Sequence, residues 1–150
     1  MRRSEREITD PAVMEDVLSR ATVCRLGLCD DEQPYVVPMN FGYENRTLYF
    51  HSAAEGQKLD ILRRNNRVCF QVDTDVEIVV GDTGCNCRTR YRSVIGFGRA
   101  TFIEDPAEKR RALAVLMRHY ASGTFVFPDD AVAKTCVFRV DVTRMTGKQA

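Results

Sequence analysis

Residues able to hold an anion gather in the segment Phe50–Lys58. His51 and Ser52 close a strand-like run, and Lys58 lies about one turn into the helix expected next. A strand end that leads into a helix start presents unpaired backbone N–H groups, and an ammonium adds a full positive charge, so such a segment suits a phosphate. The alternative is a solvated turn with an ordinary surface lysine, and the residues alone leave both interpretations open.

A second group with chemical potential occupies the segment Arg88–Ala100. Arg88, Arg90 and Arg92 place three cations within five residues, and Ser93 adds a hydroxyl group. The strand expected over 91–103 then has a nearly bare face made of Gly96, Gly98 and Ala100. Guanidinium groups suit phosphate oxygens, and a bare face admits a flat ring, another backbone or a barrel corner. A ligand-facing strand and a solvated basic strand are equally compatible with this composition.

The rest of the sequence excludes several classes of function. It contains no glycine-rich nucleotide loop, no nucleophile elbow and no zinc-protease helix motif. The net charge of +1 gives no general reason to expect nucleic acid, and no apolar run approaches the length of a membrane span. The close cysteine pair, Cys85 and Cys87, lacks the spacing of zinc or redox motifs, so we predict no metal site. Six cysteines without an export signal indicate reduced thiols and a cytoplasmic location.

The elements that must position these residues follow from hydrophobic periodicity and turn signals. Helices are predicted after the caps Asp10 and Asp105, and across Ala53–Asn65. Strands are predicted over 22–29, 34–43, 47–52, 67–73, 76–80, 91–103 and 136–142, and the first three form a meander. Pro38 places its strand at a sheet edge or marks a bulge. We therefore predict a mainly β fold, an antiparallel β-barrel with peripheral helices.

Three motifs together resemble one protein family. PYVVPMNFGY, LYFHSA-x-x-G-x-K and YRSV-x-G-x-G-x-A occur in this order. Their joint occurrence resembles the FMN-binding split-barrel proteins related to pyridoxamine 5′-phosphate oxidase, in the branch that includes nitroimidazole-resistance proteins. The resemblance extends from about Leu18 to Val142. It implies a single domain over residues 1–150, folded as a six-stranded antiparallel split barrel, and a homodimer that holds FMN in clefts between its subunits.

The resemblance also implies roles for individual residues. The isoalloxazine ring would lie along Val37, Pro38, Met39 and Asn40. The phosphate end of FMN would be held by His51, Ser52 and Lys58, and approached from the long strand by Arg92, Ser93 and Val94. In nitroimidazole-resistance relatives a histidine near the flavin has an active-site role, and His51 is the matching candidate for a catalytic residue.

The function that the resemblance implies is that of a flavin-dependent oxidoreductase. Electrons would pass from a reductant such as NAD(P)H through FMN to a small organic acceptor such as a nitro-aromatic. The alternative is a non-catalytic flavin- or haem-type ligand-binding protein, because His51 is the only histidine near the expected cleft. Pyridoxamine 5′-phosphate oxidation itself is not expected, since the final segment VTRMTGKQA has no histidine. Residues 86–88 stand where relatives carry an aromatic residue, so a different substrate side is expected.

Overall fold

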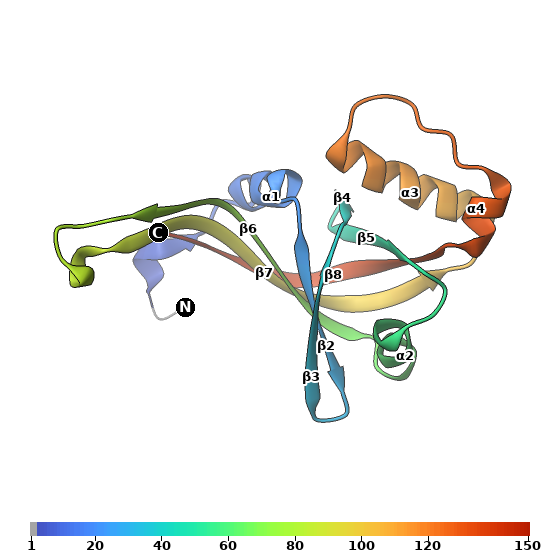
Figure 1. Cartoon of the computed structure of the whole chain (residues 1–150), viewed down its shortest axis with the longest axis horizontal. Coiled ribbons are helices and arrows are strands. Elements are labelled where there is room, and N and C mark those ends of the chain that lie inside the picture. Colours follow the sequence, from blue (N-terminus) through green and yellow to red (C-terminus); the bar gives the residue numbers. More distant parts are fainter. Residues whose placement is uncertain (1–2) are drawn as a thin grey trace.

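The computed structural model describes residues 3–150 as a strongly curved antiparallel sheet flanked by helices (Figure 1). The helices are α1 (Pro11–Arg20), α2 (Gln57–Arg64), α3 (Pro106–Tyr120) and α4 (Asp129–Lys134). The strands are β1 (Glu7–Ile8), β2 (Cys24–Asp30), β3 (Gln33–Met39), β4 (Gly42–Glu44), β5 (Thr47–Ser52), β6 (Arg67–Val79), β7 (Arg88–Ile103) and β8 (Cys136–Gln149). Within residues 3–150, no helix is both long and apolar enough to cross a membrane.

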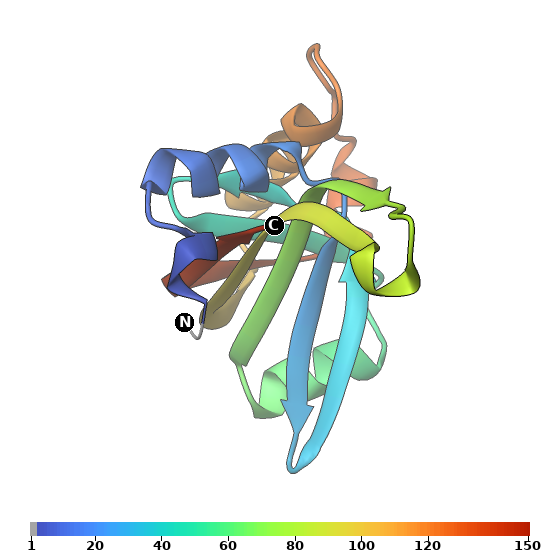
Figure 2. The ribbon, with the colours of Figure 1, turned by 90° about the vertical axis from the view of Figure 1, so that its left-hand side faces the viewer.

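The sheet of this described chain has eight strands in the order β3-β2-β6-β7-β8-β5-β4, with β1 paired to β8. Figure 2 shows β6, β2 and β3 side by side in this order. The predicted mainly β architecture with peripheral helices is confirmed. The strand count exceeds the expected six because β1, with two residues, and β4, with three, add short pieces to the longer strands.

The sheet does not close between β3 and β4, although these strands follow one another in the sequence. After Met39 the chain leaves the ladder, and the Phe41 N–H donates a hydrogen bond to the Tyr120 hydroxyl of α3 at 2.9 Å. The Phe41 ring is fully buried there. β4 then pairs with β5 at the far end of the strand order. Both hairpins of the predicted three-strand meander form, β2–β3 and β4–β5. Its continuous middle strand is wrong, because burying Phe41 against α3 sends the chain to the other end of the sheet.

Two helices begin where the sequence predicts. Asp10 and Asp105 each accept a backbone N–H from the following turn at 2.9 Å, and a proline occupies the first helical position in both. α1 then packs on β6 and β7, whereas α3 packs on β4 and β5. α2 is shorter than the predicted Ala53–Asn65, because residues 53–56 form the loop that leads into it.

The bare face of β7 points into the core of the barrel. A Cβ added at Gly96 would lie 2.2 Å from the Phe70 ring, and one at Gly98 would lie 2.5 Å from the Asp141 carbonyl oxygen of β8. Phe70 itself is 1% exposed. The missing side chains thus make room for a core ring and a neighbouring strand. Of the alternatives that the sequence left open, the close approach of another backbone is found at Gly98, whereas Gly96 makes room for a core ring and not for a flat ligand.

β6 and β7 continue beyond the body of the molecule as a two-stranded arm, residues 75–91 (Figure 1). The sequence predicted two strands over 67–80, but β6 is one strand with a bulge between Thr74 and Glu77. Asp75 lies in this bulge with a φ of 57°, in the left-handed region that aspartate tolerates. Large exposed apolar side chains on the arm are Val76, Ile78 and Val80.

β8 is also longer than predicted. It continues past Val142 to Gln149, pairs with β7 over most of its length, and receives the short β1 near its end. Residues 143–149 are largely polar, so hydrophobic alternation does not reveal the strand there. Hydrogen bonding to β7 extends it instead.

Candidate functional site

The structure brings seven of the predicted site residues into one pocket. The pocket has a volume of about 440 Å³ and lies where the ends of β3 and β5 meet the start of α2. Its lining consists of Val37, Pro38, Met39, Asn40, His51, Ser52, Ala53 and Lys58. β3 and β5 lie towards opposite ends of the strand order, so the pocket bridges the gap where the sheet fails to close. Ala53 is the lining residue that the sequence analysis did not single out.

β3 contributes to the pocket as an edge strand. Within residues 3–150 it pairs with β2 alone, so the outer edge of its backbone keeps unpaired N–H and C=O groups. Pro38 has no N–H to pair and stands opposite Arg25 of β2. The predicted edge position of Pro38 is confirmed. An apolar strand with a polar backbone edge suits a flat aromatic ligand that has polar atoms on its rim.

His51 and Ser52 end β5 beside the pocket. His51 is exposed, yet the protein atoms around it displace enough water to lower the pKa of its imidazole below the ordinary value. The ring is therefore neutral at pH 7, with one nitrogen able to donate a hydrogen bond and the other to accept one. The Ser52 hydroxyl donates to the Ala53 carbonyl oxygen at 2.8 Å. To hold a phosphate, this hydroxyl would have to rotate away from that carbonyl.

The start of α2 favours a bound anion. Gly56 precedes the helix with a φ of 136° and a ψ of 156°, a conformation that a residue with a Cβ rarely adopts. No side chain caps the helix, so its first backbone N–H groups have no partner in the helix itself. Lys58 lies in the first turn, half-buried, and forms no ion pair within residues 3–150. A cation there opposes the helix dipole, and a bound anion would relieve that repulsion.

The other three predicted residues lie elsewhere, on β7 near the root of the arm. The Val94 side chain is fully buried in the core, so a ligand could reach only its backbone. Ser93 is half-buried opposite Asp73 of β6. Arg92 lines a separate hollow of about 880 Å³ between α1, β6 and β7. One chain therefore does not bring Arg92, Ser93 and Val94 to the pocket that contains Lys58.

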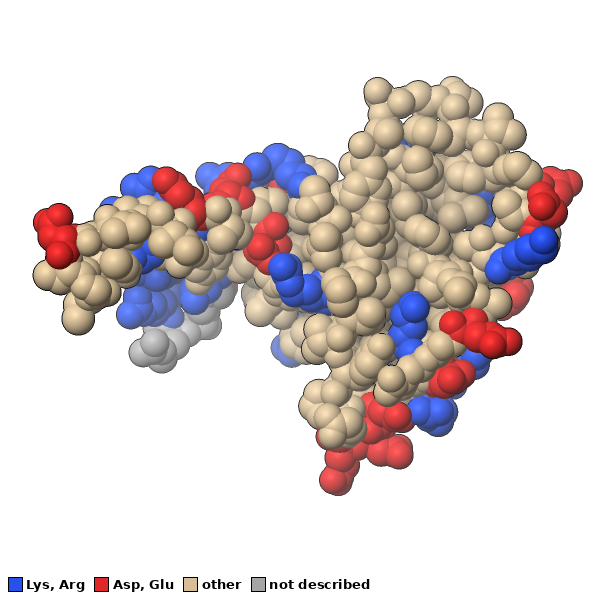
Figure 3. Space-filling view, in the orientation of Figure 1, with Lys and Arg blue, Asp and Glu red and all other residues tan. Residues whose placement is uncertain are grey.

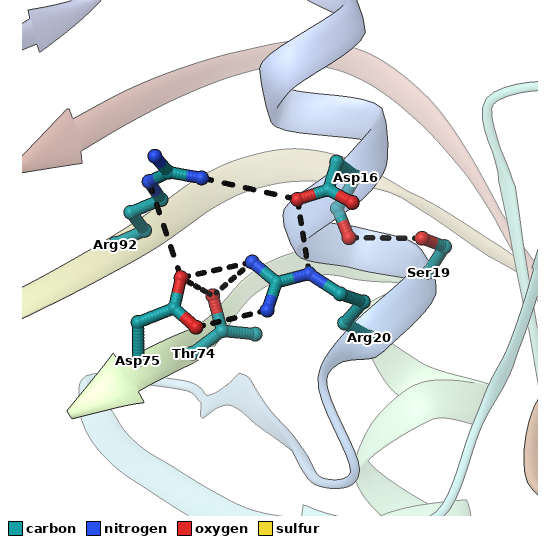
Figure 4. Close-up of polar contacts among 6 residues, drawn as sticks. All are labelled: Asp16, Ser19, Arg20, Thr74, Asp75 and Arg92. Carbon is teal, nitrogen blue, oxygen red and sulfur yellow. Dashed lines mark hydrogen bonds and ion pairs between the residues drawn. The ribbon is translucent and has the colours of Figure 1, made fainter.

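Arg92 belongs to an ion-pair group, the arm-root cluster, made of Asp16, Arg20, Asp75 and Arg92 (Figure 4). Arg20 of α1 donates to both carboxylate oxygens of Asp75 at 2.8 Å and, through Nε, to Asp16 at 2.9 Å. Hydrogen bonding from Arg20 is the main reason why the pKa of Asp75 falls to about 2. The cluster therefore ties the end of α1 to the bulge at which the arm begins.

The sequence contains only part of the signal for this cluster. Asp16 and Arg20 are four residues apart, which is the spacing of a helical ion pair. Asp75 lies 55 residues beyond Arg20 and meets it only because β6 passes α1. The folded sheet alone supplies that contact.

The second histidine has a structural partner, and the cysteines form no disulfide in the part of the chain that the structure describes. His119 Nε2 lies 2.7 Å from the Ala21 carbonyl oxygen, and its ring centroid lies 4.5 Å from that of Phe41, so it joins α3 to the chain after α1. All six cysteines are free thiols, and burial raises the pKa of Cys24 to about 12. Among the residues that the structure describes, no group of three or more His, Cys, Asp or Glu side chains could hold a metal ion.

A family model described as pyridoxamine 5′-phosphate oxidase matches residues 10–149. The chain belongs to this family. The match includes both the pocket at the start of α2 and the arm-root cluster. The family predicted from the three motifs is thus confirmed.

Solved structures share the split-barrel fold. A protein of Bacteroides thetaiotaomicron, described as a candidate 5-nitroimidazole antibiotic resistance protein, is 44% identical, with a TM-score of 0.86 over 95% of this chain and 86% of that chain. An FAD-binding protein of Mesorhizobium loti is 28% identical, with a TM-score of 0.72 over 97% of each chain. A flavocytochrome of Azotobacter vinelandii, at 21% identity, has the same fold, with a TM-score of 0.86 over 100% of this chain and 72% of that chain.

One curated relative comes from Rhizobium meliloti (strain 1021) and is described as an uncharacterised protein. It is 36% identical over 58 residues, which amount to 39% of this chain and 38% of that protein. The matched part thus spans well under half the length of either chain.

Proposed function

We propose that this chain binds FMN in the pocket at the start of α2 and acts as an oxidoreductase. Electrons pass from a reductant such as NAD(P)H through FMN to a small organic acceptor such as a nitro-aromatic. The observation that carries the proposal is the convergence of the β3 edge, His51 and Lys58 on one pocket. The 44% identical nitroimidazole-resistance relative supports the choice of acceptor, and the FAD-binding relative supports a flavin.

The residues of the pocket fit FMN at both ends of the molecule. Backbone N–H groups in the first turn of α2 and the Lys58 ammonium donate to the phosphate oxygens. The unpaired backbone edge of β3 bonds the polar rim of the ring, and Val37 and Met39 provide apolar contact. FMN, when bound, supplies the hydride- and electron-transfer chemistry.

His51 is the acid–base group of this site. Its lowered pKa keeps the imidazole neutral at pH 7, so the protonated ring nitrogen donates a hydrogen bond to the acceptor while the other nitrogen accepts one. Its exposed position leaves the ring accessible to a small substrate. Pyridoxamine 5′-phosphate is not the substrate that we propose, because residues 142–149, which end β8, include no histidine.

A second copy of the chain completes the site. Arg92 and Ser93 lie away from the pocket in one chain. In the proposed dimer, the partner supplies them from the root of its arm. A two-stranded arm is only marginally stable alone, and it exposes Val76, Ile78 and Val80. The outer face of the sheet adds a hollow of about 830 Å³ lined in part by exposed Val36 and Phe97.

The surface supports this assembly. In Figure 3 charged residues gather on the arm, around the tip of the β2–β3 hairpin and along the right-hand edge, and much of the face between them carries no charged residue. Exposed large apolar side chains such as Val76, Ile78 and Val80 are typical of surfaces that another chain covers. Light scattering during size-exclusion chromatography should give twice the mass of the chain. A monomer at micromolar concentration would remove the second copy from the proposal.

The purified protein tests flavin binding. We expect the visible absorption of a bound flavin. Adding FMN to the apoprotein at a hundred times its dissociation constant should raise the free energy of unfolding by about 2.7 kcal/mol. That gain corresponds to a rise in Tm of roughly 5 to 10 °C for a chain of this size. Protein without flavin absorption and without a shift in Tm would overturn the proposal.

A non-catalytic flavin- or haem-type binding protein is the second candidate. One observation favours it: in the described lining of the pocket, His51 and Lys58 are the titratable side chains. Rapid mixing of FMN-loaded protein with NADH and with NADPH separates the two candidates. Bleaching of the flavin absorption that reverses when a nitro-aromatic is added supports the oxidoreductase. An unchanged spectrum supports the binding protein.

A further inference from the structure

We infer that Arg20 is a positioning residue for Arg92. By bonding both carboxylate oxygens of Asp75 and Oδ2 of Asp16, it leaves the Arg92 guanidinium able to bind the phosphate of the cofactor. The inference rests on the proposed function, in which Arg92 of one copy contacts FMN in the pocket of the other. Arg20 itself contacts only the protein.

The two acids of the arm-root cluster are already bonded to Arg20. Its Nη1 and Nη2 each lie 2.8 Å from one carboxylate oxygen of Asp75, which is the bidentate arrangement that suits a guanidinium. Its Nε lies 2.9 Å from Asp16 Oδ2, and its Nη2 also reaches the Thr74 hydroxyl at 3.5 Å. Figure 4 shows the Asp75 carboxylate turned from β6 towards Arg20. All three nitrogens of Arg20 are therefore committed to the protein.

Arg92 shares the same acids without bonding to them. Its Nε lies 3.9 Å from Asp75 Oδ2 and its Nη1 lies 4.0 Å from Asp16 Oδ2, and both distances exceed that of a hydrogen bond. Within residues 3–150 its side chain makes no hydrogen bond. Its backbone stands opposite Thr74, directly beside the bulge. The acids thus hold Arg92 by charge while its N–H donors remain available to a ligand.

Without Arg20, both the position of Arg92 and the charge around it would change. The cluster contains two acids and two arginines, so its formal charges cancel. Removing Arg20 leaves one net negative charge, which repels a phosphate. It also exposes two unsatisfied carboxylates, onto which Arg92 would close to form the missing hydrogen bonds. Both effects withdraw Arg92 from a phosphate ligand.

A purely structural role for Arg20 makes a different prediction. Arg20 also joins α1 to β6, so its loss could loosen the arm and weaken every flavin alike. Positioning of Arg92 predicts selectivity, because riboflavin lacks the phosphate that Arg92 binds. It also predicts rescue by Asp75→Asn, which removes the excess negative charge and one of the two attracting carboxylates. Asparagine tolerates the left-handed backbone at this position.

The test measures FMN and riboflavin affinity by fluorescence titration of the full-length apoprotein. Arg20→Gln should raise the dissociation constant for FMN about tenfold or more and change that for riboflavin less than about twofold. Arg20→Gln with Asp75→Asn should return FMN affinity to within about threefold of wild type. Arg20→Gln with Arg92→Ala should bind FMN no more weakly than Arg92→Ala alone, because the two residues act as one unit.

Arg139→Gln is the matched control. The Arg139 side chain is 42% exposed, as is that of Arg20, and its Nε bonds Asp141 at 3.3 Å on β8, outside the cluster. It should bind both flavins like wild type. Melting curves report whether each variant folds. If Arg20→Gln does not fold, Arg20→Lys replaces it, because lysine keeps the charge but loses the bidentate contact, and its FMN affinity should fall severalfold.

The outcomes distinguish the inference from the function on which it rests. If the wild-type protein binds neither flavin, the proposed function fails and the role of Arg20 fails with it. If wild type binds FMN but Arg20→Gln binds it equally well, the positioning role alone is overturned. Equal losses of FMN and riboflavin affinity, or no rescue by Asp75→Asn, would also overturn it in favour of a structural tie.

Discussion

The pocket at the start of α2 and the arm-root cluster hold their cations in opposite ways. Lys58 lies in the first turn of a helix, where the dipole opposes a positive charge, and the described chain gives it no acid partner. Arg20 lies in the last turn of α1, where the dipole favours a cation, and it bonds Asp16 and Asp75. At the start of α2, the unneutralised cation lies beside unpaired helix N–H groups, which together suit an anionic ligand. In the arm-root cluster, the neutralised Arg20 instead joins α1 to β6.

Lys58→Ala should test this contrast most strongly. Loss of a charge-assisted bond to phosphate costs about 1.5 to 3 kcal/mol, which corresponds to a rise of roughly 10- to 150-fold in the dissociation constant for FMN. Riboflavin affinity should stay within about twofold, because riboflavin has no phosphate. Lys134→Ala, at the C-terminal end of α4, is the matched lysine control and should change neither constant. Equal losses of affinity for FMN and riboflavin would contradict the assignment of the phosphate site to the start of α2.

Gly56→Ala should show how much the positive φ before α2 depends on glycine. An added Cβ would meet no atom within 4 Å, so the φ of 136° alone is responsible for any cost. We expect a loss of about 1 to 3 kcal/mol in the free energy of unfolding by urea. Gly84→Ala, also with open space but without a positive φ, should change stability by less than about 0.5 kcal/mol. Equal effects of the two substitutions would show that the conformation at Gly56 is not strained.

Asp75→Asn should change the acid sensitivity of the arm-root cluster. The pKa of Asp75 is lowered to about 2, so Asp75 stabilises the folded state above pH 4 and loses that contribution as the pH falls towards 2. The drop in Tm between these pH values should be smaller in Asp75→Asn than in wild type. Parallel curves for the two proteins would mean that the carboxylate adds nothing to the joint between α1 and β6.

His51→Gln, in the pocket at the start of α2, should have the smallest effect of these substitutions, a change in how the Tm depends on pH. Desolvation lowers the pKa of His51, so the unfolded chain takes up its proton first as the pH falls. His51 therefore contributes stability that is present above about pH 6.5 and is lost below it. Between pH 7 and pH 5, the Tm of the His51→Gln apoprotein should fall less than the Tm of the wild-type apoprotein. A larger loss in the variant would contradict the direction of this shift.

Much of the secondary structure could be predicted because its signals are local. Asp10 and Asp105 cap helices within a few residues of chain, and β5 begins and ends where the pattern places it. The failures involve long-range pairing. β6 continues through its bulge and β8 runs to Gln149 because hydrogen bonding to β7 sustains them where the hydrophobic pattern is weak.

The candidate site was partly predictable for the same reason. Val37–Asn40, His51, Ser52 and Lys58 carry family motifs and meet in one pocket, as expected. Arg92 was expected to contact the FMN phosphate together with these residues, yet within one chain Arg92 lies beside α1. A motif records which residues occur, and the strand order decides which of them can meet within one chain.

By itself, the sequence determined the family, the mainly β class, the helix starts and the edge position of Pro38, because these depend on residue types and short spacings. Only the tertiary structure decided that β3 and β4 separate at Phe41, that Gly96 faces Phe70, and that Arg20 bonds Asp75. These contacts join positions far apart in the chain. These contacts stabilise the fold only after the whole sheet has formed in its strand order, so no local sequence pattern can encode them.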